Sequence, residues 1–234
     1  AAIQSHLDKQ VWLDLSKFPT ATNAYYLLST YRVRELVLLA TSSSLFDLCT
    51  VLSASPNLQT VVFCSLSNEF TTYVFGSEIL PTIGGEPSEP NFRFNHVTTV
   101  GVKQSNMSLL CMFPNVQRLH VIDTLTDWEE DFQSSAPIKE VEIHINISIL
   151  QSLGIIKMLK SSFPDMDTLY MNLICGPNEK TCKRIEATGQ EVGVKVYCQF
   201  THHSKLTFDL GSTSYHGYFN AYGNTPFNVL KNSN

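Results

Sequence analysis

The stretch Phe113-Pro-Asn-Val-Gln-Arg-Leu-His-Val121 recurs in altered form at two other places in the chain. Its copies are Ser55-Pro-Asn-Leu-Gln-Thr-Val-Val-Phe63 and Phe163-Pro-Asp-Met-Asp-Thr-Leu-Tyr-Met171. In each copy an apolar residue follows Pro-Asn or Pro-Asp, and further apolar residues follow three and five positions later. Recurrence in one frame is the signature of a repeat protein. The chain is therefore expected to be a solenoid of stacked units.

The same apolar spacing extends beyond these three stretches. We number each block from its first apolar residue, so that apolar side chains stand at positions one, four and six. The six blocks are Val33/Leu36/Leu38, Leu58/Val61/Phe63, Val97/Val100/Val102, Val116/Leu119/Val121, Ile138/Val141/Ile143 and Met166/Leu169/Met171, with degraded copies at Val11/Leu13/Leu15 and Val192/Val194/Val196. Because side chains alternate along a strand, positions four and six face one way, so each block predicts a short strand with one buried face.

Helical patterns lie between these predicted strands. Residues 42–55 and 149–163 carry apolar side chains at helical spacing, and the run 178–188 has Pro177 before it and Gly189 after it, as helices commonly do. Strands and helices alternate with a unit of roughly two dozen residues, which suits a solenoid. The expected fold is α/β, with about seven to eight irregular repeats, parallel strands on a concave face and helices on the convex face.

The repeats resemble those of a known family. Their Pro-Asn-Leu-x-x-Val-x-Phe pattern is similar to the irregular leucine-rich repeats of F-box proteins. The resemblance covers about residues 9–200. That resemblance implies a non-catalytic domain that binds the substrate of an F-box-type ubiquitin ligase. It also implies that the ligase adaptor is bound by a segment not present in this chain.

Domain organisation follows from the repeats. We expect one repeat domain over residues 1–234, with repeats over 9–200, an insertion at 68–95 and a C-terminal capping tail at 201–234. The second half of the insertion is rich in Gly and Pro and predicts a loop. Within the tail, Leu206–Leu210 alternates like a strand. The tail is expected to cover an open end of the array, because terminal units need atypical caps.

Composition narrows the possible partners. The chain has 234 residues, of which 43% are hydrophobic and 16% charged, with a formal net charge of −5. Such a balance does not favour nucleic-acid binding, which depends on clustered Lys and Arg. No apolar run approaches the roughly 20 residues of a membrane span. We therefore expect a protein partner, no membrane and no nucleic acid, in the cytoplasm or nucleus.

Two alternatives remain open on sequence. One is an extracellular repeat receptor, which the sequons at Asn106 and Asn146 and a disulfide between Cys175 and Cys182 would suit. The other is an RNA-export-type repeat module that binds RNA and protein, although the low Lys and Arg content counts against it. The six cysteines show no paired spacing, and most are expected to be buried thiols.

No catalytic signature is visible in the sequence. It contains no Gly-rich phosphate loop, no His-Glu-x-x-His and no Gly-x-Ser-x-Gly. His202 and His203 are adjacent, and adjacent side chains on a strand face opposite ways, so they predict no metal site. We expect a protein that is not an enzyme and that needs neither cofactor nor metal.

The candidate site is the strand face that points away from the helices. Positions three, five and seven of the later blocks are expected to be exposed there and to form a polar surface for a protein target. Tyr, Arg and Asn are residue types suited to binding surfaces. The predicted partner-binding residues are Arg118, His120, Glu140, Glu142, His144, Tyr170, Asn172, Lys195 and Tyr197.

Overall fold

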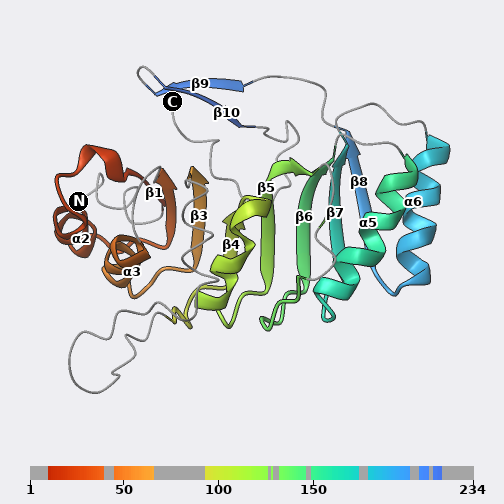
Figure 1. The fold of residues 1–234 in the computed structure, drawn as a ribbon, viewed down its shortest axis with the longest axis horizontal. Helices are drawn as coiled ribbons and strands as arrows, with labels where there is room; N and C mark the ends of the chain where they lie inside the picture. Colours follow the sequence, from red (N-terminus) through yellow and green to blue (C-terminus); the bar gives the residue numbers. More distant parts are fainter. Residues whose placement is uncertain are drawn as a thin grey trace. The chain divides into compact units, whose positions relative to one another are not determined.

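The chain folds as alternating strands and helices (Figure 1). The structure is a computed structural model that describes residues 10–39, 45–65, 93–125, 128, 132–145, 149–173, 179–200, 206–210 and 213–217. The described chain divides into two compact units. Unit 1 runs to Leu119 and includes Ser134–Pro137, and unit 2 contains His120–Gln133 and the chain from Ile138 onward. The expectation of a single repeat domain stays a prediction.

Within each unit, the parallel strands are arranged in the order in which they occur in the sequence. The strands β1 to β4 are Gln10–Asp14, Glu35–Leu39, Thr60–Ser65 and Thr99–Val102, and they neighbour one another in that order. The strands β5 to β8 are Arg118–Leu125, Glu140–Ile145, Thr168–Leu173 and Lys195–Phe200, also in order. Sequential parallel pairing is the arrangement that the repeats predicted, so the α/β fold with parallel strands is confirmed.

The register of the strands agrees with the spacing of the six blocks. Residues at the same position of successive blocks lie directly opposite one another across neighbouring strands. The position-four pairs are Leu36 with Val61, Val61 with Val100, Val141 with Leu169 and Leu169 with Val196. The last pair corrects the frame predicted for 192–196, because Val196 occupies position four and Cys198, opposite Met171, position six.

The turn before each strand explains why Pro-Asn and Pro-Asp recur. The position-one N–H of Leu58 donates to the carbonyl of Ser55 at 3.0 Å, and Met166 donates in the same way to Phe163 at 2.9 Å. Proline presets the backbone angle that such a turn requires at its second residue, and Asn or Asp suits the third. Each turn therefore aims the following strand into the sheet.

Position two links neighbouring repeats through the backbone. The carbonyl of Gln59 accepts hydrogen bonds from the N–H groups of both Thr98 and Thr99, at 2.9 and 3.1 Å. In unit 2 the carbonyl of Lys139 accepts in the same way from Asp167 and Thr168, at 3.0 and 3.1 Å. Backbone groups at the start of each strand are thus satisfied by the preceding repeat, which holds successive turns in step.

The core includes the apolar positions of the six blocks that the sequence predicted to be buried. All eighteen residues of the six blocks are at most 1% exposed. Three phenylalanines, Phe63, Phe113 and Phe163, are fully buried, and Phe63 packs against Phe113 within unit 1 with ring centroids 6.1 Å apart. Because the same positions are filled in each repeat, apolar layers continue from one strand to the next, as a solenoid requires.

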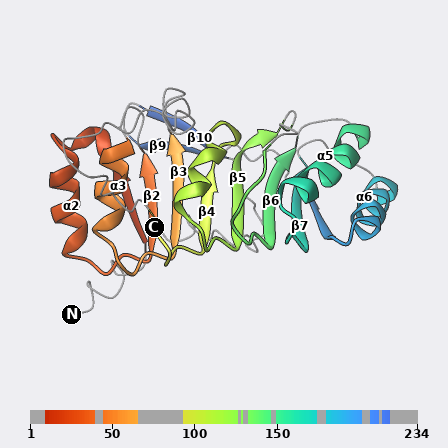
Figure 2. The same cartoon turned by 60° about the horizontal axis from the view of Figure 1, so that its bottom comes forward.

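Helices cover one side of the strands within each unit (Figure 2). In unit 1, α2 (Ala21–Ser29) packs against α3 (Leu45–Ser53), and β1 is followed by the short 3-10 helix η1 (Leu15–Lys17). In unit 2, α5 (Ile149–Ser162) packs against α6 (Glu179–Glu191), which packs on β8. The segment between β4 and β5 is the 3-10 helix η2 (Gln104–Met112).

The sequence predicted α3, α5 and α6 but missed α2. This helix begins at Thr20, whose side chain accepts a hydrogen bond from the N–H of Asn23, as an N-cap does. Only Ala24 and Leu28 of the helix are buried, while Tyr26 is 65% exposed. An apolar stripe this narrow leaves a weak periodic signal, which is why the helix was not recognised.

The predicted end of α6 was wrong. The helix continues through Gly189 to Glu191, and Gly193, with a φ of +73°, forms the turn instead. Gly189 does not end the helix. It is required for close packing, because a Cβ added there would lie 2.7 Å from the carbonyl oxygen of Val194. The absence of a side chain therefore lets α6 approach the start of β8 closely.

We expect Gly189→Ala to lower the free energy of unfolding by about 1–3 kcal/mol, because the new methyl group must displace backbone. Gly154→Ala is the matched control, since a Cβ at this exposed position of α5 meets nothing within 4 Å. Alanine is the better helix former, so the control should gain up to about 1 kcal/mol. Urea unfolding of both variants measures the difference. Equal stability of Gly189→Ala and the parent would contradict the close approach.

The tail contains the predicted strand. Leu206–Leu210 forms β9, which pairs antiparallel with β10 (Thr213–Gly217). The expectation that the tail covers an open end of the array stays a prediction. The predicted insertion, 68–95, lies outside the described residues except for its last three. Among the described helices, none is long and apolar enough to cross a membrane.

Candidate functional site

The predicted site residues of unit 2 lie on one face of its strands. We call this set, together with the neighbouring Thr168, the polar strand face: His120, Glu140, Glu142, His144, Thr168, Tyr170, Asn172, Lys195 and Tyr197. The register places them in rows, with Glu140, Thr168 and Lys195 opposite one another at position three, and Glu142, Tyr170 and Tyr197 at position five. His144 and Asn172 are opposite one another at position seven. Arg118 belongs to unit 1 and is exposed.

The sequence predicted that the whole polar strand face is exposed to solvent. The structure shows that only part of it is. Glu142 and His144 are 2% exposed and Asn172 is 1% exposed, whereas Tyr197 is 37% exposed. Neighbouring strands lie only about 4.8 Å apart, so a side chain on an inner strand is shielded by its neighbours on both sides. The prediction of solvent exposure was therefore wrong for Glu142, His144 and Asn172.

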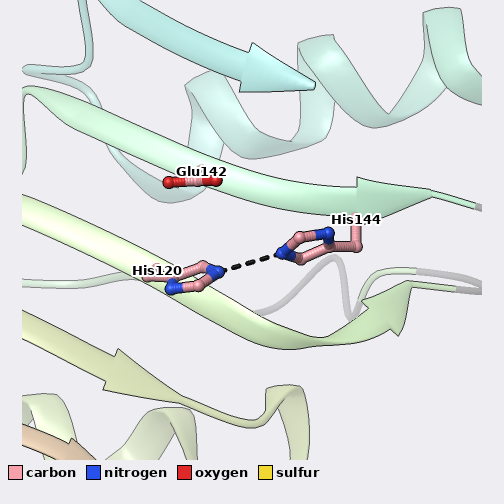
Figure 3. A group of neighbouring side chains, drawn as sticks. All are labelled: His120, Glu142 and His144. Carbon is pink, nitrogen blue, oxygen red and sulfur yellow. Dashed lines mark hydrogen bonds between the residues drawn. The ribbon is translucent and has the colours of Figure 1, made fainter. Parts of the chain in front are cut away.

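This face brings together two histidines and a carboxylate, of which Glu142 and His144 are buried and His120 is half-buried. His120 on β5 and His144 on β6 point toward one another, with their Nε2 atoms 3.0 Å apart, and Glu142 lies beside them (Figure 3). One ligand atom from each of the three side chains lies within 4.8 Å of the other two. Among the described residues, this is the group of histidine, cysteine and acidic side chains arranged closely enough to hold a metal ion.

Asn172 completes the arrangement from the next strand. Its side-chain Nδ2 donates a 2.8 Å hydrogen bond to Oε1 of Glu142 and so orients the carboxyl group. The second oxygen, Oε2, is buried and has no hydrogen-bond partner among the described residues, and the same is true of Nδ1 of His144. Buried polar atoms are nearly always paired, so a further group beside either of these atoms would be favourable.

Burial controls the protonation of this cluster. It raises the pKa of Glu142 to about 7, opposed only by the hydrogen bond from Asn172. Burial lowers the pKa of His144 to about 4. The pKa of His120 is held well below its usual value by burial and then by the neighbouring His144. At neutral pH both imidazoles are therefore neutral and each offers a nitrogen lone pair.

The more exposed part of the face is an aromatic pair with a cation. The rings of Tyr170 and Tyr197 are stacked, with centroids 5.2 Å apart and planes at 12°. The amine of Lys195 lies 4.7 Å from the centre of the Tyr197 ring. A hydrogen bond with Tyr197 raises the pKa of Lys195, so the amine stays charged at neutral pH. Two aromatic rings and one positive charge thus share a patch that solvent reaches.

The sequence identified most of these residues but not the way they group. It placed all three members of the buried cluster on one face and assigned them to partner binding. A metal-ligand motif shows itself by short spacing along one segment, whereas His120 and Glu142 come from different repeats. The strand register was the available signal, because it sets which positions become neighbours.

The features that favoured an extracellular receptor are weakened. Asn106, the acceptor of the first sequon, is 1% exposed in η2, and a glycan attaches only to an accessible side chain. Cys182 is a free thiol, as are Cys49, Cys64, Cys111 and Cys198, which contradicts the Cys175–Cys182 disulfide. Asn146 and Cys175 lie outside the described residues.

Among the described residues, the polar strand face carries the candidate functional groups. No protein-family model matches the chain, and no curated protein matches it.

Proposed function

We propose that this chain is a non-catalytic protein-recognition domain of the leucine-rich-repeat type, and that it binds its target through Tyr170, Tyr197 and Lys195. The stacked pair of the half-buried Tyr170 and the exposed Tyr197 is the observation that carries the proposal. Tyrosine provides a large contact area with little loss of side-chain entropy, and it is enriched among residues that dominate binding energy. The repeat fold supports the proposal, since solenoid strands present continuous surfaces to partners.

The chemistry of the patch defines the partner. Lys195 presents a positive charge beside the rings, which a carboxylate on the partner would pair with. The rings are suited to a flat or apolar side chain that covers them. The partner is accordingly a protein segment that carries an acidic residue close to an aromatic or apolar one.

We expect Tyr170→Ala and Tyr197→Ala each to weaken binding by about 1–2 kcal/mol while the melting temperature changes little. A library of displayed random peptides, selected on the parent chain, supplies the ligand. The enriched peptide is synthesised and titrated against each variant by calorimetry. Enriched sequences should contain the acidic and aromatic pair, because Lys195 and the stacked rings select for both.

Tyr26→Ala is the matched control, because Tyr26 is the more exposed tyrosine but lies on α2 in unit 1. It should bind the peptide as the parent does. Equal affinity of both polar-face variants and the parent would overturn the proposal, as would enrichment of peptides without an acidic residue. Size-exclusion chromatography tests whether a second copy of the chain is the occupant instead, and a stable dimer abolished by Tyr197→Ala would establish that outcome.

We further propose, from the resemblance to F-box repeats, that the target is presented to a ubiquitin ligase through an adaptor bound outside this chain. The full-length protein should then bind a purified ligase adaptor and support ubiquitin transfer to a substrate held by the polar strand face. Transfer should fall with Tyr197→Ala while adaptor binding does not change. Failure of the full-length protein to bind any such adaptor would overturn the ligase role and leave the recognition surface unaffected.

A further inference from the structure

Partner binding through Tyr170, Tyr197 and Lys195 leaves the buried Glu142 and His144 and the half-buried His120 of unit 2 without a role. Glu142 and His144 are 2% exposed, so neither can contact a partner across the polar strand face. Ionisable side chains are rarely buried so fully unless they are paired or hold a metal. A ligand bound next to these side chains inside the protein would compensate for the cost of burying them.

We propose that His120, Glu142 and His144 bind a zinc ion, with Asn172 as the residue that positions the glutamate. The geometry is close to what zinc requires. Two nitrogen ligands at about 2.05 Å from a tetrahedral zinc lie about 3.3 Å apart, and the two Nε2 atoms are 3.0 Å apart. The ligand atoms of all three residues lie within 4.8 Å of one another, so Glu142 is placed to supply the third ligand.

A direct hydrogen bond between the two imidazoles is the competing explanation for the short distance. It would pair the Nε2 atoms, with one ring as donor and the other as acceptor. It would leave Oε2 of Glu142 buried without a partner among the described residues. A cation between the three side chains satisfies this oxygen as well as the Nε2 atoms of the two imidazoles.

Asn172 fits the role of an outer residue at a metal site. Ligating carboxylates are usually held by a second hydrogen bond that orients them and leaves the other oxygen for the metal. The 2.8 Å bond from Nδ2 of Asn172 to Oε1 of Glu142 provides this, and Oε2 remains available. The three strands β5, β6 and β7 thus each contribute a residue to one site.

The donor set selects the type of cation. Two imidazoles and one carboxylate suit zinc and the neighbouring divalent transition metals. Calcium takes six to eight oxygen ligands and magnesium keeps several waters, so neither suits two nitrogen donors. A bound zinc would connect β5 to β6 through side chains and add to the stability of unit 2.

The test begins with the full chain after treatment with a chelator. Zinc is titrated in competition with a chromophoric chelator, and one equivalent should bind with a Kd of about 1 μM or tighter, whereas magnesium should not compete. Cobalt(II) added instead should give the strong visible absorption of a four- or five-coordinate site. X-ray absorption at the zinc edge should show two imidazole ligands.

Three variants test the assignment. His120→Ala and Glu142→Gln should each weaken zinc binding at least tenfold, and Asn172→Ala by about 10–100-fold, as loss of an outer hydrogen bond does elsewhere. His96→Ala is the control for histidines outside the cluster, because His96 is exposed in unit 1. Thermal melts in chelator show which variants fold, and only those that melt cooperatively are scored.

The results of these measurements either support or overturn the zinc site. Tight binding that is lost in Glu142→Gln or His120→Ala, together with two imidazoles at the zinc edge, supports it. Binding weaker than about 100 μM, or binding that neither variant changes, overturns it. The absorption measurements use only the parent chain, so a weak octahedral cobalt spectrum overturns the proposal even where a variant does not fold.

Discussion

Replacing Leu169 by alanine lowers the free energy of unfolding by about 2–5 kcal/mol. Leu169 stands at position four of its block, is fully buried, and lies opposite Val141 on one side and Val196 on the other. Truncation removes apolar contacts with both neighbouring strands and leaves a cavity that close-packed layers cannot fill. Urea unfolding followed by circular dichroism measures the loss.

Thr168→Ala is the matched control, because Thr168 is the adjacent residue, is half-buried and points to the opposite face of β7. Its effect should stay within about 0.5 kcal/mol. Leu119→Ala repeats the test in unit 1, where Leu119 is 1% exposed at the same repeat position. A loss below about 0.5 kcal/mol at both leucines would contradict the register on which the repeat assignment rests.

Glu142→Gln should make the protein more stable than the parent at pH 8 by about 3 kcal/mol when a chelator removes metal. Burial raises the folded-state pKa of Glu142 from 4.5 to about 7. Below pH 4.5 the carboxyl group is neutral in both the folded and the unfolded chain. The parent then has its full stability, because no charge has to be buried. Between pH 4.5 and 7 the unfolded chain releases the proton while the folded chain retains it, so the parent loses about 1.4 kcal/mol per pH unit. Glutamine has no proton to release.

The measurement is the difference between the two unfolding free energies from pH 4 to pH 8. His144 adds a slope of opposite sign, because its pKa is lowered to about 4 and stability is lost as pH falls through that range. That slope is present in both proteins, so the subtraction removes it. Glu140→Gln takes a half-exposed carboxylate from the same strand and is the matched control. A difference that does not change with pH would contradict burial of the ionised form as the cause.

The repeat positions were predictable because they depend on local rules. Apolar residues at positions four and six face one way on any strand, and a proline followed by Asn or Asp turns the chain wherever it occurs. The burial of Val61, Leu119 and Leu169 and the pairing of equivalent positions followed from these rules. The helix α6 was also predicted, but its end was not, because Gly189 is required by the approach of β8.

The candidate site was predictable only in part. The sequence placed Tyr170 and Tyr197 on one face, and the structure shows them stacked at 5.2 Å. It also placed His144 there, but as an exposed contact residue. The difference arises because exposure depends on what surrounds a side chain in space, whereas the face of a strand depends on its position in the sequence alone.

The strand faces and the buried residues of the six blocks follow from spacing along the chain, so the sequence was enough to predict them. Only the fold shows that His120, Glu142 and His144 come together. The register of two neighbouring strands brings the three side chains together, and burial keeps the imidazoles neutral and raises the pKa of Glu142. Neither effect can be read from one strand, because both depend on side chains contributed by other repeats.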